Sequence, residues 1–381
     1  KPSTVVWCMG QTQHTVGNAN VRAMCILQLV LGNVGTSGGG TNIFRGHDNV
    51  QGATDVGPNP DSLPGYYGLA AGSWKHWCKV WGVDYEWVKS QYASQAMMEK
   101  SGITVSRWID GVLEKNENID QDSNLRAVVY WGMAPNSQTR GLEMVEAMKK
   151  LDMLVVIDPY PSATAAMAAM MRKDGVYLLP ACTQFETSGS RTASNRSLQW
   201  GEKVIEPLFE SKPDHTLMYA FAKKFGFEKE LVKNIKLIKD KQGWDEPEIE
   251  DILREINKGC WTIGYTGQSP ERLKLHMQNM HTFDVKTLKA NGGPCDGEYF
   301  GLPWPCYGTP ELKHPGTPNL YDTSKHVMDG GGNFRANFGV ERDGVSLLAA
   351  DGSASKGAAL QMGYPEFDHV LLKKLGWWDD L

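Results

Sequence analysis

The sequence predicts an α/β fold built on a parallel sheet. Strand and helix patterns alternate from the first residues to about residue 225, as α/β folds require. Apolar runs such as residues 154–157 are nearly continuous, which is typical of parallel strands covered by helices on both faces. The predicted strands end on glycine or proline, where a chain turns toward its next element. We therefore expect dinucleotide-binding-like layers over residues 1–260.

The individual elements follow from local patterns. Strands are expected where short apolar runs rich in β-branched residues occur, at residues 4–8, 126–131, 153–157 and 176–179. Helices are expected where helical periodicity or helix-end signals occur, at residues 18–31, 141–150, 214–226 and 246–258.

The ends of these helices carry specific signals. Residues 18–31 are apolar on nearly every side, so this helix is expected to be buried, with Gly32 as its C-terminal cap. Asp214 is expected to be an N-cap. Pro247 suits the first turn of the last helix, because the N–H that it lacks has no partner there.

Beyond residue 260 the composition changes. Glycine and proline become dense, and neither strand nor helix periodicity persists. Aromatic residues such as Trp304, Phe334 and Phe338 argue against plain disorder. We predict that residues 261–381 form an extended, irregular segment that packs on the body of the protein or on a partner.

Charge and composition exclude several kinds of protein. With 39 basic and 44 acidic residues the net charge is -5, so no overall basic field exists to bind nucleic acid. No apolar run approaches the ~20 residues of a membrane helix, and direct membrane insertion is not expected. The 7 cysteines are scattered without a Cys-x-x-Cys pair, which argues against an iron–sulfur cluster or zinc site held by this chain alone.

The ends of the predicted strands are candidate ligand-binding loops. In open α/β sheets ligands bind outside the carboxyl ends of parallel strands, and glycine there lets a ligand approach the backbone. Asp158 could accept hydrogen bonds from a guanine amine or a ribose hydroxyl. Ordinary turns between strands and helices explain the pattern equally well. The candidates at these ends are Met9, Gly10, Thr12, Gln13, Gly132, Met133, Asn136, Asp158, Pro159 and Thr183.

A nicotinamide-dinucleotide fingerprint is missing. The glycine cluster at residues 32–40 follows a helix instead of joining a strand to one, and it lacks the Lys-Ser/Thr ending of a P-loop. We interpret it as a connector that shapes the segment after it.

That segment, residues 45–55, is the densest polar stretch of the chain. Arg45 could clamp a small carboxylate, because a guanidinium matches carboxylate geometry. His47 could donate or accept a proton near neutral pH. His47, Asp48 and Asp55 could instead bind a metal, but their spacing matches no standard ligand set. A solvated polar loop is the remaining alternative.

Several of these runs resemble the large subunits of metal-dependent formate dehydrogenases, which are molybdopterin oxidoreductases. The resemblance is most specific in the first 65 residues and extends over most of residues 1–310. Its clearest motifs are Met9-Gly-Gln-Thr-Gln13, Leu29-Val-Leu-Gly-Asn33, Arg45-Gly-His-Asp-Asn-Val-Gln-Gly52 and Val155-Val-Ile-Asp-Pro159. His47 makes the chain more similar to the respiratory branch. The resemblance therefore implies a periplasmic location, with a cytoplasmic one also possible.

The resemblance implies a site and a set of partners. Arg45 would hold formate beside the metal, and His47 would lie at the adjacent polar position. The strand-end candidates would hold a molybdopterin guanine dinucleotide, in an enzyme with two such pterins and Mo or W. Formate would be oxidised reversibly to CO2 at that centre. Electrons would leave through iron–sulfur clusters held outside this chain, toward an electron-transfer subunit.

The sequence departs from the family pattern at the metal ligand. No cysteine here is followed by histidine, and neither the cysteine-rich cluster motif nor the C-terminal barrel is evident. The chain also begins at Lys1. We therefore expect this chain to be an internal part of such a subunit that works together with the remainder of it. The isolated chain is not expected to reduce a dye when formate is supplied. The alternatives are another molybdopterin oxidoreductase and a non-catalytic α/β nucleotide-binding or structural fragment.

Overall fold

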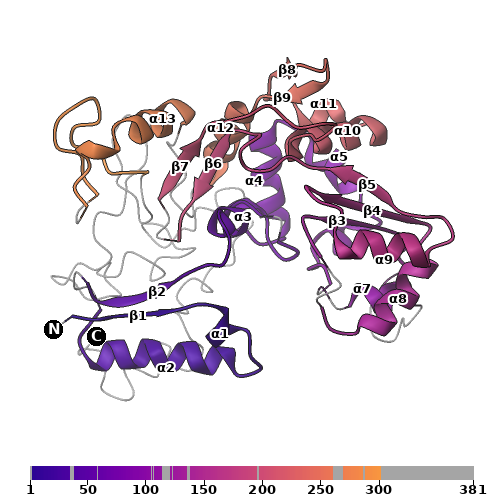
Figure 1. Ribbon diagram of the computed structural model, residues 1–381, viewed down its shortest axis with the longest axis horizontal. Coiled ribbons are helices and arrows are strands. Elements are labelled where there is room, and N and C mark those ends of the chain that lie inside the picture. The colour runs from indigo at the N-terminus through magenta and orange to yellow at the C-terminus, as the bar shows by residue number, and fades with distance from the viewer. Residues whose placement is uncertain are drawn as a thin grey trace. The chain divides into compact units, whose positions relative to one another are not determined.

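A computed structural model describes residues 2–34, 38–57, 59–103, 105, 107–113, 121, 123–134, 138–194, 197–260, 269–285 and 288–301 (Figure 1). The chain forms two compact units. One comprises Lys1–Glu99, Ser190–Trp200 and Ile252–Leu381, and the other comprises Lys100–Gly189 and Gly201–Asp251. The predicted division into residues 1–260 and 261–381 stays a prediction, and residues 302–381 of the second part lie outside the described residues.

The first unit opens with a parallel strand pair. β1 (Thr4–Trp7) pairs with β2 (Gly40–Ile43), with Thr4 opposite Gly40 and Trp7 opposite Ile43. The connection between the two strands contains two helices, α1 (Met9–Thr12) and α2 (Gly17–Val30). The residues that follow β1, predicted as a loop, therefore begin with one short helical turn.

The prediction that α2 is buried is wrong for this structure. Its buried residues are Gly17 and Gln28, whereas Leu29 and Val30 are 62% and 78% exposed. Gln28 turns inward because its amide donates hydrogen bonds to the backbone carbonyls of Ser3, at 2.7 Å, and Gly40. The amide thus ties the helix to the residue before β1 and to the first residue of β2. Apolar composition alone did not reveal which side of the helix would face the sheet.

Short helices and a small sheet complete the first unit. Trp77 on α4 is fully buried, and an added Cβ at Gly259 on α12 would lie 2.8 Å from its ring, so these two helices are in close contact. The elements of this unit, some of which extend across its limits, are α3 (Val50–Asp55), η1 (Pro64–Tyr66), α4 (Ala71–Trp81), α5 (Tyr85–Ser90), α6 (Gln95–Met98), β6 (Gly189–Thr192), β7 (Leu198–Gly201), α12 (Ile249–Gly259), α13 (Pro270–Gln278) and η4 (Met280–Thr282).

The second unit contains the predicted parallel sheet. β4 (Met153–Asp158) lies between β3 (Ala127–Trp131) and β5 (Tyr177–Pro180), and both of its pairings are parallel. The helices that join the strands are α8 (Gly141–Lys150) and α9 (Ala163–Met171), and the unit also contains α7 (Trp108–Val112), α10 (Asp214–Phe225), α11 (Glu228–Leu231) and the hairpin of β8 (Leu237–Lys239) and β9 (Asp245–Pro247).

The sheet is covered on both faces, as its apolar strands predicted. Leu154 and Val156 pack with Met144 and Met148 of α8 in one core cluster. The alternate residues Val155 and Ile157 pack with Leu217 of α10 in a second cluster. Because successive side chains of a strand point to opposite faces, one continuous apolar run supplies both cores.

Three further predictions need correction. Pro247 ends β9 and does not enter a helix, and α12 begins only at Ile249. Pro213 occupies the N-cap of α10, and the carboxylate of Asp214 instead accepts a 2.6 Å hydrogen bond from Trp131 Nε1. Beyond residue 260, where no regular structure was predicted, α13 forms because Ser269 caps it and Pro270 fits its first turn.

A buried histidine anchors the chain after α13. His276 is 1% exposed and lies against Phe283 and Phe300. Its Nδ1 accepts a 3.0 Å hydrogen bond from the N–H of Gly301, so Nε2 carries the proton and donates to Glu298 at 2.7 Å. Burial lowers the pKa of His276, the bond to Glu298 opposes this, and the charge of Arg272 adds to it.

This histidine predicts a pH-dependent stability. Its folded pKa lies below the unfolded value of 6.5, so the unfolded chain binds a proton first and the free energy of unfolding falls as the pH drops below about 6.5. One such group changes that free energy by at most about 1.4 kcal/mol per pH unit. We expect a shallower decline between pH 7.5 and 5.5 for His276→Gln than for wild type, measured by urea unfolding. Equal slopes would contradict the assignment.

None of the helices among the described residues is long and apolar enough to cross a membrane.

Candidate functional site

A hollow of about 390 Å³ opens at the carboxyl ends of β1 and β2 in the first unit. The two strands run in parallel, and the N–H of Phe44 donates to the carbonyl of Trp7 at 3.0 Å, so the segments that follow both strands start side by side. Two separately predicted site segments, around Met9 and around Arg45, therefore meet in one hollow. Its lining residues are Trp7, Cys8, Met9, Thr12, Val21, Ile43, Arg45, Gly46 and Val50.

Arg45 is the charged residue in this lining and is half-buried. Its Nη1 donates to Thr54 Oγ1 at 3.1 Å, and its backbone N–H donates to Ser194 Oγ at 3.4 Å. These are its polar contacts among the described residues, and neither partner is a carboxylate. A guanidinium that keeps its net charge beside apolar walls favours binding of an anion.

The loop that carries Arg45 is fastened to β6 and the turn after it. Asn49 adopts a left-handed backbone conformation, with φ 57°, and its Oδ1 accepts a 2.9 Å hydrogen bond from the N–H of Thr192. Asp48 forms a 3.2 Å ion pair with Arg191. Together with the bond from Arg45 to Ser194, these contacts hold the loop from a segment more than one hundred residues away in sequence.

Gly52 makes the Asn49 contact possible. A Cβ at this position would lie 2.0 Å from Asn49 Oδ1 and 3.1 Å from Thr192 Oγ1. No heavy atom can approach that closely, so any side chain here would displace the amide that accepts from β6. The spacing of Asn49 and Gly52 in the polar stretch therefore has a steric reason.

Below the loop, a buried carboxylate holds α3. Asp55 is 1% exposed and its Oδ1 accepts hydrogen bonds from Gln51 Nε2 at 2.7 Å and Tyr66 OH at 2.8 Å. The helix that supplies Thr54 is thus tied to η1. Gln51 and Asp55 have structural roles here.

His47 lies outside the lining of the hollow. Its side chain is exposed, and Nδ1 donates to the carbonyl of Asp48 at 2.8 Å. His47 is thus not among the lining residues that include Arg45, and its expected position near the substrate stays a prediction. Asp48 and Asp55, the other members of the alternative metal set, have the separate partners given above, and no group of three or more potential metal ligands occurs among the described residues.

Gly10 and Gln13 shape the turn that carries Met9 and Thr12. The N–H of Gln13 donates to the Met9 carbonyl at 2.8 Å, and the Gly10 carbonyl accepts from His14 Nε2 at 2.8 Å. An added Cβ at Gly10 would meet nothing within 4 Å. The backbone at the carboxyl end of β1 is therefore open on this side.

The remaining candidates gather at one edge of the sheet in the second unit. Gly132 follows β3, Asp158 ends β4, and Thr183 follows β5. The N–H of Gly132 donates to the backbone carbonyl of Ile157 at 2.8 Å. The N–H of Ala181 donates to the backbone carbonyl of Asp158 at 3.2 Å, so the three strand ends stay adjacent. Met133 and Pro159 follow directly at the same edge, whereas Asn136 lies outside the described residues.

Asp158 and Thr183 differ in what they can offer a ligand. One oxygen of Asp158 accepts from the N–H of Tyr160 at 3.0 Å, and its other oxygen has no partner among the described residues. The N–H and the hydroxyl of Thr183 both donate to Glu186 at 2.7 Å. Thr183 can therefore only accept a further hydrogen bond, whereas Asp158 keeps a charged acceptor.

Glu186 is buried and accepts hydrogen bonds from Thr183, Leu208 and Ser211. Burial raises its pKa, but hydrogen bonds from the backbone of Thr183 and Leu208 and from the hydroxyls of Thr183 and Ser211 outweigh that effect, so the pKa lies below its usual value. The carboxylate stays ionised and fixes the segment after β5. Glu186 was not among the residues predicted from the sequence, since its partners Leu208 and Ser211 lie more than twenty residues further along the chain.

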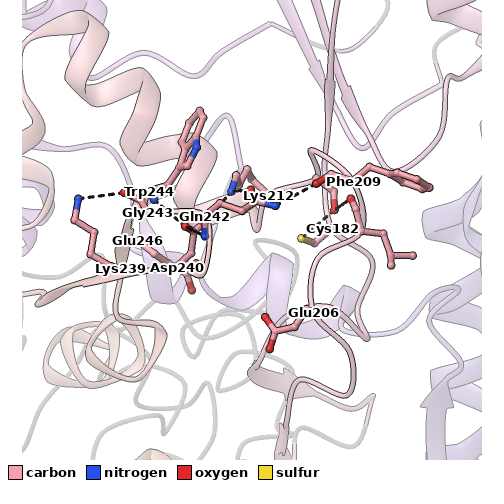
Figure 2. Close-up of polar contacts among 12 residues, drawn as sticks. Cys182, Glu206, Phe209, Lys212, Lys239, Asp240, Gln242, Gly243, Trp244 and Glu246 are labelled. Carbon is pink, nitrogen blue, oxygen red and sulfur yellow. Dashed lines mark hydrogen bonds and ion pairs between the residues drawn. The ribbon is translucent and has the colours of Figure 1, made fainter.

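A second hollow, of about 270 Å³, is lined by Glu186 in the second unit, and each of its lysines forms an ion pair with a carboxylate. Figure 2 shows Lys212 beside Gln242 and Asp240; its Nζ donates to Asp240 at 2.6 Å and lies 5.0 Å from the ring centroid of Trp244. Lys203 and Lys241 share Glu206, and Lys239 pairs with Asp245. This pairing distinguishes the second hollow from the one that Arg45 lines.

Within each unit, the strand ends leave room for a ligand beside the backbone. An added Cβ at Gly46 or Gly132 would also meet nothing within 4 Å, and Gly132 has φ +60°, which favours glycine. The indole N–H of Trp7, in the wall of the first hollow, is buried without a partner among the described residues. Open backbone at the ends of parallel strands and polar groups without a partner are typical of ligand-binding loops.

Comparison with known proteins identifies the family. Residues 1–224 match the family described as molybdopterin oxidoreductase. The F420-dependent formate dehydrogenase subunit alpha of Methanocaldococcus jannaschii is 29% identical over 330 residues, which are 86% of this chain and 38% of that protein. The formate dehydrogenase subunit alpha of Megalodesulfovibrio gigas is 32% identical over 253 residues, 59% of this chain and 25% of that protein.

Among solved structures, acetylene hydratase from Pelobacter acetylenicus is similar over 56% of this chain and 26% of its own, at 14% identity and a TM-score of 0.30. The chain spans well under half the length of the formate dehydrogenase subunits it matches. The family match covers more than half of this chain and includes β1 to β7 and most of α10. The chain belongs to the molybdopterin oxidoreductase family.

Proposed function

We propose that this chain is part of a formate dehydrogenase that oxidises formate reversibly to CO2, and that Arg45 orients the formate. The observation that supports this most strongly is the unneutralised guanidinium of Arg45 in a hollow with apolar walls. A single small anion would find one charged partner there, and its carboxylate could accept two parallel hydrogen bonds. The relatives named formate dehydrogenase subunit alpha support formate as that anion.

The proposal assigns the strand ends to the cofactor, a bis-molybdopterin guanine dinucleotide with Mo or W. Met9, Gly10, Thr12 and Gln13 would face it in the first unit. The residues that would hold it in the second unit are Gly132, Met133, Asn136, Asp158, Pro159 and Thr183. When bound, the metal centre supplies the two-electron redox chemistry that takes hydrogen from the formate carbon. The chain itself supplies anion binding, orientation and an apolar wall.

The proposed oxidation needs an outlet for two electrons. An iron–sulfur subunit or domain is the proposed acceptor, because no Cys-x-x-Cys pair occurs in this sequence to hold a cluster. A periplasmic location, or alternatively a cytoplasmic one, is part of the same proposal.

A substrate comparison tests this proposal. The cofactor-loaded enzyme would be given formate, acetate and formamide separately, and reduction of a viologen dye would be measured. Of the three compounds, we expect only formate to support dye reduction. Acetate lacks a hydrogen on its carboxyl carbon, and formamide lacks the charge that Arg45 recognises. Dye reduction that is equal with and without formate would contradict the proposal and would favour another member of the family.

The cofactor assignment makes a separate prediction for Asp158. Replacing Asp158 with asparagine should weaken binding of GDP, a soluble analogue of the dinucleotide end, by about 10-fold or more, because a hydrogen bond to a charged acceptor is worth about 1.5–3 kcal/mol. Isothermal titration calorimetry measures this. Asp174→Asn is the matched control, since Asp174 is exposed in the turn before β5, at the opposite edge of the same sheet. Unchanged GDP affinity in Asp158→Asn would rule out the guanine contact.

A further inference from the structure

Arg45 is oriented by a short chain of hydrogen bonds. Its Nη1 donates to Thr54 Oγ1 at 3.1 Å, and the Thr54 hydroxyl donates to the carbonyl of Val50 at 2.8 Å. Thr54 is half-buried on α3, one turn after Val50. The acceptor for Arg45 therefore belongs to a helix that the buried Asp55 fixes in place.

The direction of these bonds is determined by chemistry. A hydroxyl has one hydrogen, and that of Thr54 is committed to Val50, so its oxygen can only accept. A guanidinium can only donate, so the two groups match. Thr54 is also β-branched, and its stiff χ1 holds the oxygen in one direction. One arm of Arg45 is thus positioned while its other donors stay available for a ligand.

A neutral partner is unusual among the arginines of this chain. Most of the other arginines that the structure describes form an ion pair with a carboxylate; Arg172 instead donates to backbone carbonyls. These pairs are Arg107 and Arg140 with Asp110, Arg126 with Asp152, Arg191 with Asp48, Arg254 with Glu271 and Arg272 with Glu298.

We propose that Thr54 is a positioning residue, which orients Arg45 toward the hollow without neutralising it, so that the charge is kept for the substrate anion. The inference rests on the proposed function, in which Arg45 binds formate. It goes further by assigning a residue that makes no contact with the substrate. Thr54 would set how tightly formate is bound through the geometry and charge of Arg45.

Three substitutions separate orientation from charge. Thr54→Ser keeps the hydroxyl. Thr54→Val keeps the shape and removes the acceptor, so Arg45 loses its orientation but not its charge. Thr54→Asp supplies a carboxylate at the same place, which would form an ion pair with Arg45 and compete with formate. The predicted order of formate affinity is therefore serine above valine, and valine above aspartate.

Steady-state kinetics of the cofactor-loaded enzyme test this order. We expect Thr54→Ser to stay within about threefold of wild type, and the KM for formate to rise about 10-fold in Thr54→Val and about 100-fold in Thr54→Asp, since bonds to charged groups are worth about one to two powers of ten. The dye-reduction kcat should change less than the KM in Thr54→Val. Cofactor content and thermal midpoint should stay at the wild-type values in that variant.

A binding measurement on the purified 381-residue chain provides a readout without turnover. Saturation-transfer NMR detects the C–H proton of formate when it binds weakly. We expect a signal for wild type and Thr54→Ser, a weaker one for Thr54→Val, and none for Thr54→Asp or Arg45→Ala. If Arg45→Ala keeps the wild-type signal, the proposed function fails. If Arg45→Ala loses it but Thr54→Val keeps both the wild-type signal and KM, only the role of Thr54 is overturned.

Discussion

Replacing Arg45 with alanine is expected to lower kcat/KM for formate by about 100- to 1000-fold, the usual cost of removing one charge-stabilising donor from an active site. The guanidinium is the charged group in the lining of the hollow, and none of its partners among the described residues is acidic. Arg45→Lys should recover only part of the loss, because an ammonium keeps the charge but not the two-pronged geometry. Formate-dependent dye reduction by the cofactor-loaded enzyme measures both.

A matched control is Arg126→Ala. The side chain of Arg126 is 79% exposed and pairs with Asp152 in the second unit, so its loss should leave kcat/KM unchanged. If Arg45→Ala and Arg126→Ala behave alike, Arg45 does not bind the substrate.

Gly52→Val is expected to displace the loop that carries Arg45. Its Cβ would lie 2.0 Å from Asn49 Oδ1, so the loop must move and the bond from Thr192 must break. Overpacking of this kind costs about 1–3 kcal/mol of stability. Because the displaced loop carries Arg45, formate oxidation should also fall by about 100-fold or more, since small shifts of catalytic groups have effects of that size.

The control for stability is Gly46→Ala, in the same loop, where an added Cβ meets nothing within 4 Å. Its thermal midpoint should match wild type, whereas that of Gly52→Val should be several degrees lower. Equal midpoints for the two variants would show that the Asn49 contact does not constrain Gly52.

The parallel sheet of the second unit could be predicted from the sequence because its signals are local. The limits of α8 match the predicted 141–150, since Met144 and Met148 recur at helical spacing on the buried face. Residues 154–157 of β4 are all apolar, so their side chains enter the core clusters on the two faces of the sheet in turn. Gly226 ends α10 in a left-handed conformation, as its place after the helical pattern indicated.

Features that depend on distant parts of the chain could not be predicted. The inward turn of Gln28 needs the carbonyls of Ser3 and Gly40, which no periodicity reveals. Pro247 joined a strand because Leu237 pairs with it, an interaction that overrides its preference for a first helical turn.

The same distinction applies to the site. Sequence indicated Met9 and Arg45 separately, but only the pairing of β1 with β2 places them in one hollow. Thr54 stood in the polar stretch without an assigned role, since its hydroxyl has meaning only beside Arg45. Thr192 and Ser194 contact the loop from about 150 residues away and carried no signal of their own. His47, expected beside the substrate, is exposed and bonded to its own loop.

The most direct test of the central claim is oxidation of ¹³C-formate by the cofactor-loaded wild-type enzyme and by Arg45→Ala at equal cofactor content. We expect wild type to release one ¹³CO2 for every two electrons delivered to the acceptor, and the variant to lose nearly all of this activity. If wild type releases no ¹³CO2 from formate, or if the variant matches it, Arg45 is not the formate-binding residue of a formate dehydrogenase.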